Sequence, residues 1–214
     1  MIYIDDKIQA YPDADIAQWI DELPQWRREK VLAFQHDLGR RQSLLAYRLL
    51  CHGLKTEYGI TEMPTFNYGT HGKPELTFHQ TAYRKLANDH HLHFSLSHCR
   101  EAVACIIAPY PIGIDIESIR RISESLIRHT MNDDEQRAIA SASSHPERAF
   151  LRFWTQKEAV GKLLGTGIRD NMKDMLSCND YHIKTRESDC WIISTAQYPK
   201  DNDGDPKAAT IYIR

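Results

Sequence analysis

The chain has 214 residues, of which 42% are hydrophobic and 26% charged, as is typical of a soluble globular protein. Its formal net charge of −2 provides no general basic field, so the charge does not indicate a nucleic-acid partner. The five scattered cysteines argue against a disulfide framework. Because we also see no signal peptide and no apolar run of membrane-spanning length, we expect a cytoplasmic protein.

The first half of the chain combines helical segments with later strands. In chain order we expect a strand at residues 1–4, helices at 14–23, 25–34 and 37–58, a turn-rich segment at 65–75, and paired strands at 92–96 and 102–108. The helix over 37–58 is the clearest, because its leucines recur at helical spacing between Gly39 and Gly59. Arg40 and Arg41 lie in its first turn, where the helix dipole disfavours cations; they either meet an anion or are simply solvated.

A Pro-Tyr-Pro break at residues 109–111 divides the chain into two proposed halves, 1–108 and 109–214. After it we expect a strand at 112–118, a helix from 132 to about 142, a long helix at 146–164, strands at 181–186, 190–196 and 208–213, and a turn at 201–206 before the last strand. Each half therefore offers helices and antiparallel strands, which predicts an α+β fold.

The strand over 112–118 carries the first indication of chemistry. Its alternation places three isoleucines on one face and leaves Asp115 and Glu117 side by side on the other. Like charges at that separation repel unless a cation lies between them, and Mg²⁺ is the common choice where phosphates are handled. An edge strand with a solvated acidic face has the same pattern, so this pair alone leaves both interpretations open.

Three side chains of the long helix share one face, because Trp154, Glu158 and Lys162 follow one another at intervals of four residues. Glu158 and Lys162 fit an ordinary surface ion pair. The functional alternative makes Glu158 a third carboxylate beside Asp115 and Glu117, with Lys162 covering a bound phosphate.

Residues 113–117 (Gly-Ile-Asp-Ile-Glu) and 154–162 (Trp-Thr-Gln-Lys-Glu-Ala-Val-Gly-Lys) together resemble the paired signature of the 4′-phosphopantetheinyl transferases, in their larger, surfactin-synthetase-activating form. Residues 72–74 (Gly-Lys-Pro) and 94–98 (Phe-Ser-Leu-Ser-His) resemble two further motifs of that family, in the right order. The resemblance implies two similar halves, each with a small antiparallel sheet packed on a long helix. It also implies a monomer, because one chain then contains both halves of a pseudo-dimer.

The activity implied by the resemblance is a group transfer. Coenzyme A donates its phosphopantetheine arm to a serine of an apo acyl or peptidyl carrier protein of fatty-acid or secondary-metabolite synthesis, leaving adenosine 3′,5′-bisphosphate. The resemblance implies that Asp115, Glu117 and Glu158 hold Mg²⁺. It also makes Glu158 the general base, directly or through water, and Lys162 the residue that stabilises the leaving bisphosphate or the transferred phosphate. Asp115, Glu158 and Lys162 are then the catalytic residues.

Coenzyme A-binding residues are implied in both halves. By resemblance they are Arg27, Lys30, Arg41, Lys73, Ser97, His98, Lys157 and Lys162. Arg40 is an alternative to Arg41, because the alignment there can slip by one residue. Glu135 matches an acidic residue that is sometimes given a metal or base role. Cys99 stands where the family has a serine and is left out of the site, and Arg100 stands where a small residue is common.

Two other functions are open at this stage. A Mg²⁺-dependent phosphohydrolase acting on a nucleotide or on the coenzyme A pyrophosphate would use the three carboxylates, but it gives no reason for Lys73 or His98. It would release phosphate without a carrier protein. A non-catalytic module that binds coenzyme A or a carrier would bind its ligand equally well after Glu158→Gln and would show no turnover.

Overall fold

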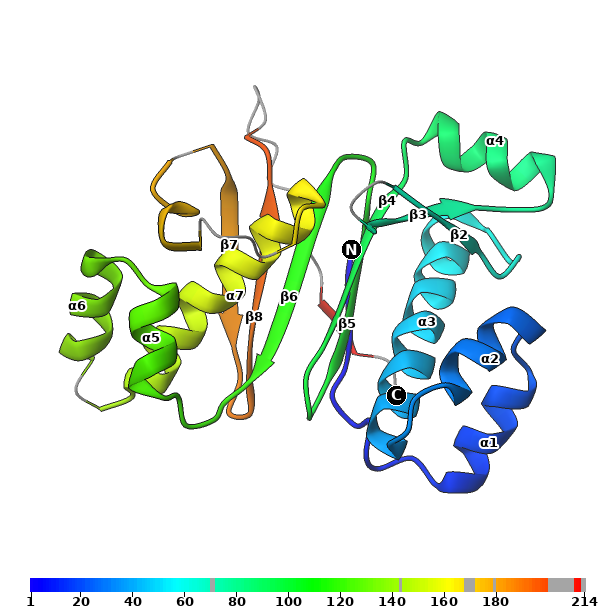
Figure 1. Cartoon of the computed structure of the whole chain (residues 1–214). Helices are drawn as coiled ribbons and strands as arrows, with labels where there is room; N and C mark the ends of the chain where they lie inside the picture. Colours follow the sequence, from blue (N-terminus) through cyan, green and yellow to red (C-terminus); the bar gives the residue numbers. More distant parts are fainter. Residues whose placement is uncertain (70–71, 143, 168–171, 179, 200–209, 213–214) are drawn as a thin grey trace.

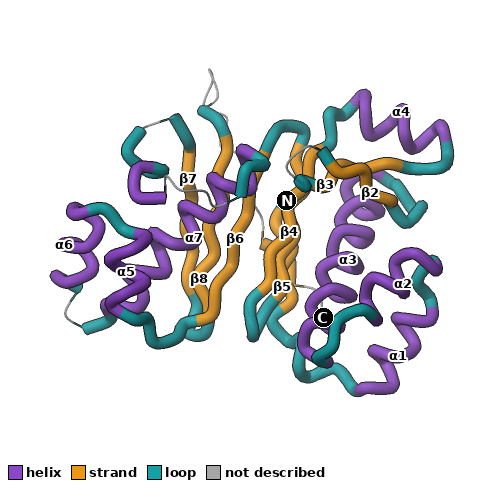
Figure 2. The backbone as a smooth tube through the Cα atoms, viewed as in Figure 1, coloured by secondary structure: helices purple, strands orange, loops and turns teal. Residues whose placement is uncertain are grey.

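In the computed structural model the chain forms two lobes that meet along the middle of the molecule (Figure 1). The structure describes residues 1–69, 72–142, 144–167, 172–178, 180–199 and 210–212. The long strands run through the centre, and helices flank them in both lobes (Figure 2). The mixture of helices and small, mainly antiparallel sheets is α+β, as the sequence predicts.

The elements follow one another with short connections. The first lobe contains β1 (Ile2–Asp5), α1 (Asp13–Asp21), α2 (Gln25–Leu32), α3 (Asp37–Tyr58), β2 (Thr65–Tyr68), β3 (Pro74–Thr77), α4 (Thr81–Asp89), β4 (His93–His98) and β5 (Val103–Ala108). The second lobe contains β6 (Ile112–Ser118), α5 (Glu124–Thr130), α6 (Asp133–Ser141), α7 (Pro146–Leu164), the short 3₁₀ helix Met172–Asp174, β7 (His182–Glu187) and β8 (Trp191–Gln197). The last strand, β9 (Thr210–Tyr212), returns to the first lobe.

The central sheet of the first lobe has the strand order β4-β5-β1-β9. Every residue of β5 is buried, which explains its continuous apolar sequence. β4 and β1 pair with β5 on either side and run antiparallel to it, so the predicted pairing of the 92–96 and 102–108 segments is confirmed. β9 lies parallel to β1 at the far edge, so the C-terminal strand completes a sheet that the N-terminal strand begins.

The sheet of the second lobe has the antiparallel order β6-β8-β7, and α7 lies across it. This contact is close at Gly113 of β6. A methyl group added there would lie 1.9 Å from the carbonyl oxygen of Ala159 and 2.6 Å from the amide nitrogen of Leu163. Only glycine lets the strand approach the helix backbone this closely. The same contact brings the middle of α7 beside the acidic residues of β6.

The two long helices confirm their predicted ranges. α3 buries nine of its residues against the strands and helices around it, and it ends at Gly59 with a left-handed φ of 67°. α7 begins with Pro146 in its first turn and ends at Gly165 with φ 72°. In the described residues, no helix combines the length and the apolar character that a membrane span requires.

Some expected elements differ from the observed ones. The turn-rich segment at 65–75 instead begins and ends in strands, because β2 and β3 pair as a hairpin around the Gly and Pro residues. Two short helices were not expected, α4 and α5, since each carries few apolar residues. Ser123 stabilises α5 by accepting a hydrogen bond from the Leu126 amide. The expected turn at 201–206 lies outside the described residues.

Candidate active site

Asp115 lies in the middle of β6 with only 5% of its surface exposed. Its Oδ1 accepts hydrogen bonds from the Ser97 hydroxyl and from the Lys162 ammonium, both at 2.8 Å. Its Oδ2 is buried and has no hydrogen-bond partner. A buried carboxylate oxygen without a partner is costly. It therefore marks a position where a cation or a hydrogen-bond donor would be stabilised.

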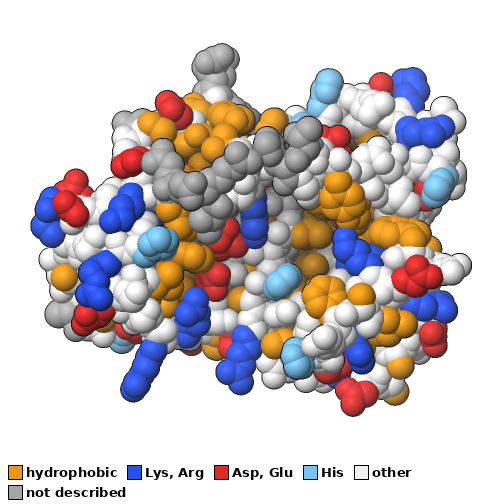
Figure 3. Space-filling model, viewed as in Figure 1, with side chains coloured by type: hydrophobic (Ala, Val, Ile, Leu, Met, Phe, Trp, Pro, Cys, Tyr) orange, Lys and Arg blue, Asp and Glu red, His pale blue; other side chains and the backbone are white. Residues whose placement is uncertain are grey.

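Two further carboxylates lie close enough to interact with Asp115. Glu117 accepts a hydrogen bond from the Trp154 indole nitrogen at 3.1 Å, and burial followed by the Asp115 charge raises its pKa. The pKa of Glu158 is raised to about 7, first by burial and then by Asp115 and Glu117, against the opposing effect of Lys162. Figure 3 shows acidic side chains gathered in the hollow between the lobes. The three carboxylates therefore form one electrostatic group with too little positive charge around it.

The carboxylates do not form a complete metal cage by themselves. Across the described residues, no three acidic, histidine or cysteine side chains are placed so that they alone would enclose a metal ion. Mg²⁺ in proteins is commonly held by one or two carboxylates together with substrate phosphates and water. The unpartnered Oδ2 of Asp115 and the mutual repulsion of the acids fit such a shared site.

Basic side chains border the acidic group on the side of the first lobe. Lys162 donates to both Asp115 and Ser97, and 29% of its side chain remains exposed. His98 ends β4, and its pKa is lowered by burial and by the Lys162 charge, while Asp115 opposes this shift. Lys162 and His98 therefore lie close to the same carboxylate.

A pocket of about 250 Å³ adjoins Lys162 where the lobes meet. Its walls come from three separate motifs and include Lys73, Pro74, Leu96 and Gly165. The Lys73 ammonium crosses between the lobes and donates to the carbonyl oxygen of Leu163 at 2.9 Å, in the last turn of α7. Burial lowers the pKa of Lys73. The Gly-Lys-Pro segment and the Lys162 end of α7 are thus brought together.

The structure corrects the role predicted for Lys157. It was expected to contact a phosphate, but its side chain is fully buried. Its ammonium donates to the Thr130 carbonyl at 2.9 Å and to Glu135 Oε2 at 2.6 Å. Glu135 also closes the capping box of α6 with Asn132. Lys157 and Glu135 therefore join α7 to α6, and neither faces the carboxylate group.

The arginines of the first lobe also differ from expectation. The guanidinium of Arg41 is buried and donates to Asp37 at 2.6 Å, to the Tyr11 carbonyl at 2.8 Å and to Asp13. The predicted role of Arg41 in binding coenzyme A is therefore wrong, because its guanidinium already donates its hydrogen bonds to these three residues. The alternative, Arg40, is partly exposed and donates to the Phe34 carbonyl.

Arg27 and Lys30 occupy different environments on α2. Arg27 is buried, donates to the carbonyl and hydroxyl oxygens of Ser43, and lies 4.6 Å from the centre of the Tyr47 ring. Its Nε has no partner. Lys30 is exposed and donates to the Tyr68 hydroxyl at 2.6 Å. Of this pair, Lys30 is the one whose ammonium is open to a ligand.

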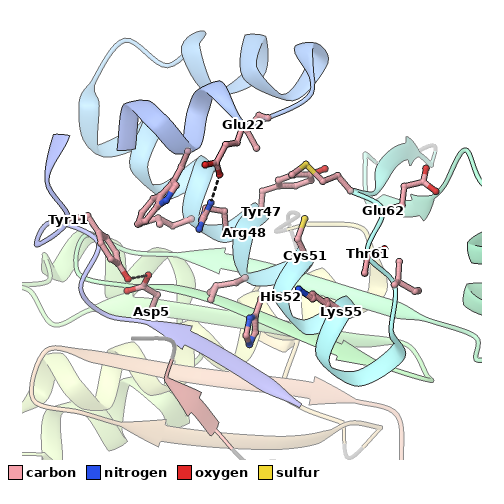
Figure 4. Close-up of a pocket in the computed structure, with 16 residues that line it drawn as sticks. Asp5, Tyr11, Glu22, Tyr47, Arg48, Cys51, His52, Lys55, Thr61 and Glu62 are labelled. Atoms are coloured by element: carbon pink, nitrogen blue, oxygen red, sulfur yellow. Dashed lines mark hydrogen bonds and ion pairs between the residues drawn. The ribbon is translucent and has the colours of Figure 1, made fainter. Parts of the chain in front are cut away.

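A separate pocket of about 370 Å³ lies in the first lobe around α3 (Figure 4). Two pairs of its polar groups bond to one another: Tyr11 donates to Asp5 at 2.9 Å, and Arg48 lies 3.6 Å from Glu22. None of the predicted site residues lines it. The acidic group between the lobes is therefore the better candidate for the active site.

Comparison with known proteins shows a family likeness for the part of the chain that carries the carboxylates. The family model of the 4′-phosphopantetheinyl transferase superfamily matches residues 111–203, a segment that contains Asp115, Glu117, Glu158 and Lys162. The 4′-phosphopantetheinyl transferase psf-1 of Bacillus pumilus is 27% identical over 168 residues, which cover 76% of this chain and 68% of that protein. The chain is therefore similar to the 4′-phosphopantetheinyl transferases, over residues 111–203 by the family model and over 76% of its length by psf-1.

Two further 4′-phosphopantetheinyl transferases match shorter segments of the chain. The 4′-phosphopantetheinyl transferase gsp of Aneurinibacillus migulanus is 32% identical over 94 residues, covering 44% of this chain and 40% of gsp. The 4′-phosphopantetheinyl transferase Sfp of Bacillus subtilis (strain 168) is 26% identical over 144 residues, covering 66% of this chain and 60% of Sfp. The matched segments thus span between 40% and 68% of the superfamily members named here.

Proposed function

We propose that this protein transfers the 4′-phosphopantetheine group of coenzyme A to a serine of an apo acyl or peptidyl carrier protein and releases adenosine 3′,5′-bisphosphate. The observation that carries the proposal is the group formed by Asp115, Lys162 and Glu158 at the junction of the lobes. It combines an incompletely neutralised cluster of carboxylates with a lysine that can reach a phosphate.

In the proposed reaction, the carrier serine oxygen bonds to the phosphorus that bears pantetheine. The bond from that phosphorus to the bridging oxygen breaks, and adenosine 3′,5′-bisphosphate leaves. Glu158 takes the serine proton, directly or through water. Lys162 offsets the negative charge that builds up on the phosphate oxygens.

The residues fit a Mg²⁺ ion shared with the substrate. Asp115, through its unpartnered Oδ2, and Glu117 and Glu158 would hold it together with the diphosphate of coenzyme A. When bound, the ion would neutralise charge on that diphosphate. For the remainder of coenzyme A, we propose His98, Lys73 and Lys30 as the contacting side chains.

We further propose that residues 1–108 and 109–214 are two related halves of a pseudo-dimeric, monomeric enzyme of the larger type. In support, each half contributes an antiparallel sheet packed on one long helix, α3 in the first and α7 in the second. A cytoplasmic location is proposed as well, and the free state of all five cysteines is consistent with it.

The direct test is incubation with coenzyme A, Mg²⁺ and an apo acyl carrier protein, followed by intact mass spectrometry of the carrier. Transfer predicts a gain of about 340 Da, the mass of one phosphopantetheine added to serine. Asp115→Ala and Glu158→Ala should abolish the gain, and Glu29→Gln, a change at an exposed position on α2, should not. Phosphate release without a carrier would instead indicate a phosphohydrolase. Binding of coenzyme A without turnover would indicate a non-catalytic module.

A further inference from the structure

Ser97 occupies the junction between the two central sheets. β4 and β6 are the facing edge strands of different sheets, and no backbone ladder joins them. Serine side chains of β4 take the place of backbone carbonyls: the Ser95 hydroxyl accepts from the Ile114 amide and the Ser97 hydroxyl from the Ile116 amide, both at 3.2 Å. These two serines therefore satisfy amides of β6 that would otherwise be buried without partners.

Of these two serines, only Ser97 also bonds to Asp115 of the acidic group. Its hydroxyl donates to Asp115 Oδ1 at 2.8 Å and accepts from the Lys162 ammonium at 2.8 Å. A serine hydroxyl has one hydrogen to donate and two lone pairs to accept with. The Ile116 amide is the third partner, so the Ser97 hydroxyl already donates one hydrogen bond and accepts two, which is the most it can make. The phosphates of coenzyme A are hydrogen-bond acceptors, so they would need the one hydrogen that Ser97 already gives to Asp115.

We propose that Ser97 is a positioning residue that orients the Asp115 carboxylate and the Lys162 ammonium, and that it does not itself bind coenzyme A. Its bonds hold Asp115 Oδ1 on the side of the first lobe and leave Oδ2 as the oxygen that is free for a cation. Hydrogen bonds that orient a ligating carboxylate typically change metal affinity 10- to 100-fold when they are removed. This inference rests on the proposed function, because it assigns Ser97 to the same metal-assisted transfer.

The chain offers a matched control. Ser95 makes the same kind of bond to β6 two residues earlier, and none of its hydrogen bonds reaches Asp115, Lys162 or Glu158. Ser95→Ala therefore removes one hydrogen bond between the sheets, whereas Ser97→Ala removes the bond to the Ile116 amide and also releases the Asp115 carboxylate and the Lys162 ammonium. The thermal unfolding midpoint should therefore fall further for Ser97→Ala than for Ser95→Ala.

The experiment measures the affinity of the full chain for Mn²⁺ in the presence of coenzyme A, from the electron paramagnetic resonance signal of free Mn²⁺. We expect Ser97→Ala to weaken Mn²⁺ binding at least 10-fold and Ser95→Ala less than twofold. In EDTA, both variants should bind coenzyme A within twofold of the wild type. If Ser97→Ala does not fold, Ser97→Cys keeps most of the side-chain volume with a much weaker donor and carries the same expectation.

Two results would overturn the proposal. One is a Ser97 variant that binds Mn²⁺ as well as the Ser95 variant does. The other is a Ser97 variant that keeps its Mn²⁺ affinity and loses affinity for coenzyme A in EDTA, which would assign Ser97 to a phosphate contact. Failure of the proposed function is a separate outcome, because it would appear in the wild type as absence of transfer to the carrier.

Discussion

Glu158→Gln should stabilise the metal-free protein above pH 7 while it abolishes transfer. In the folded protein the pKa of Glu158 is raised from 4.5 to about 7. Ionisation of this side chain therefore opposes folding. The opposing free energy is absent below about pH 4.5, grows as the pH rises between the two values, and is complete above about pH 7. A neutral glutamine of similar size removes it.

The size of the effect follows from the pKa difference. Each pKa unit corresponds to about 1.4 kcal/mol, so the ionised Glu158 destabilises the metal-free fold by about 3 kcal/mol at most. Solvent reaches this partly exposed side chain and reduces the expected gain in the glutamine variant to about 2 kcal/mol. For a domain of this size, that is a rise of about 4–8 °C in the unfolding midpoint.

The assay is thermal unfolding in EDTA at pH 8 and at pH 5, followed by circular dichroism. The stabilisation should be large at pH 8 and much smaller at pH 5, where wild-type Glu158 is itself mostly protonated. Glu29→Gln, which neutralises an exposed carboxylate on α2, should change the midpoint little at either pH. A glutamine variant no more stable than the wild type at pH 8 would refute the view that burial and the neighbouring carboxylates oppose the ionisation of Glu158 in the absence of a cation.

Three further predictions follow from the same structure. Gly113→Ala should separate β6 from α7 and abolish both stable folding and transfer, whereas Gly69→Ala, whose new methyl group meets nothing within 4 Å, should leave the unfolding midpoint unchanged. Lys157→Met should lower the free energy of unfolding in urea by about 3–5 kcal/mol, because it leaves Glu135 buried without its partner, and replacing both residues by apolar ones should recover much of the loss. Mg²⁺ with coenzyme A should raise the wild-type midpoint more at pH 8 than at pH 5, because cation binding requires ionised carboxylates; an equal rise at both pH values would contradict this.

The sequence predicted best the elements with strong periodicity. The helix over 146–164 and the strand over 112–118 appear within the expected bounds, because their apolar residues follow one repeat from end to end. The hairpin of β2 and β3 could not be seen, because its strands are short and rich in turn-forming residues. It is held by pairing between the two strands and by packing against the first lobe, which no local pattern reports.

Some site residues could likewise be placed from the sequence, and others could not. Glu158 and Lys162 face Asp115 because four-residue spacing keeps them on one side of α7. Lys157 precedes Glu158 by one residue, so it points about 100° away around the helix, toward Glu135. This rotation was available from the sequence and argues against a phosphate role. The burial of Arg41 was not available, because its partners Tyr11 and Asp13 lie about 30 residues away in sequence.

The position of the acidic group is tied to the way the two sheets meet. Had β4 and β6 joined through a backbone ladder, the amide of Ile116 would pair with a carbonyl and no hydroxyl would be needed between the strands. The serine at position 97 instead bonds to that amide and to the Asp115 carboxylate at the same time. Any change in how the lobes pack must therefore also move the carboxylate proposed to bind Mg²⁺. The Lys73 bond to the end of α7 connects the lobes at a second point. A ligand that competes for this ammonium would consequently act on the helix that carries Glu158 and Lys162.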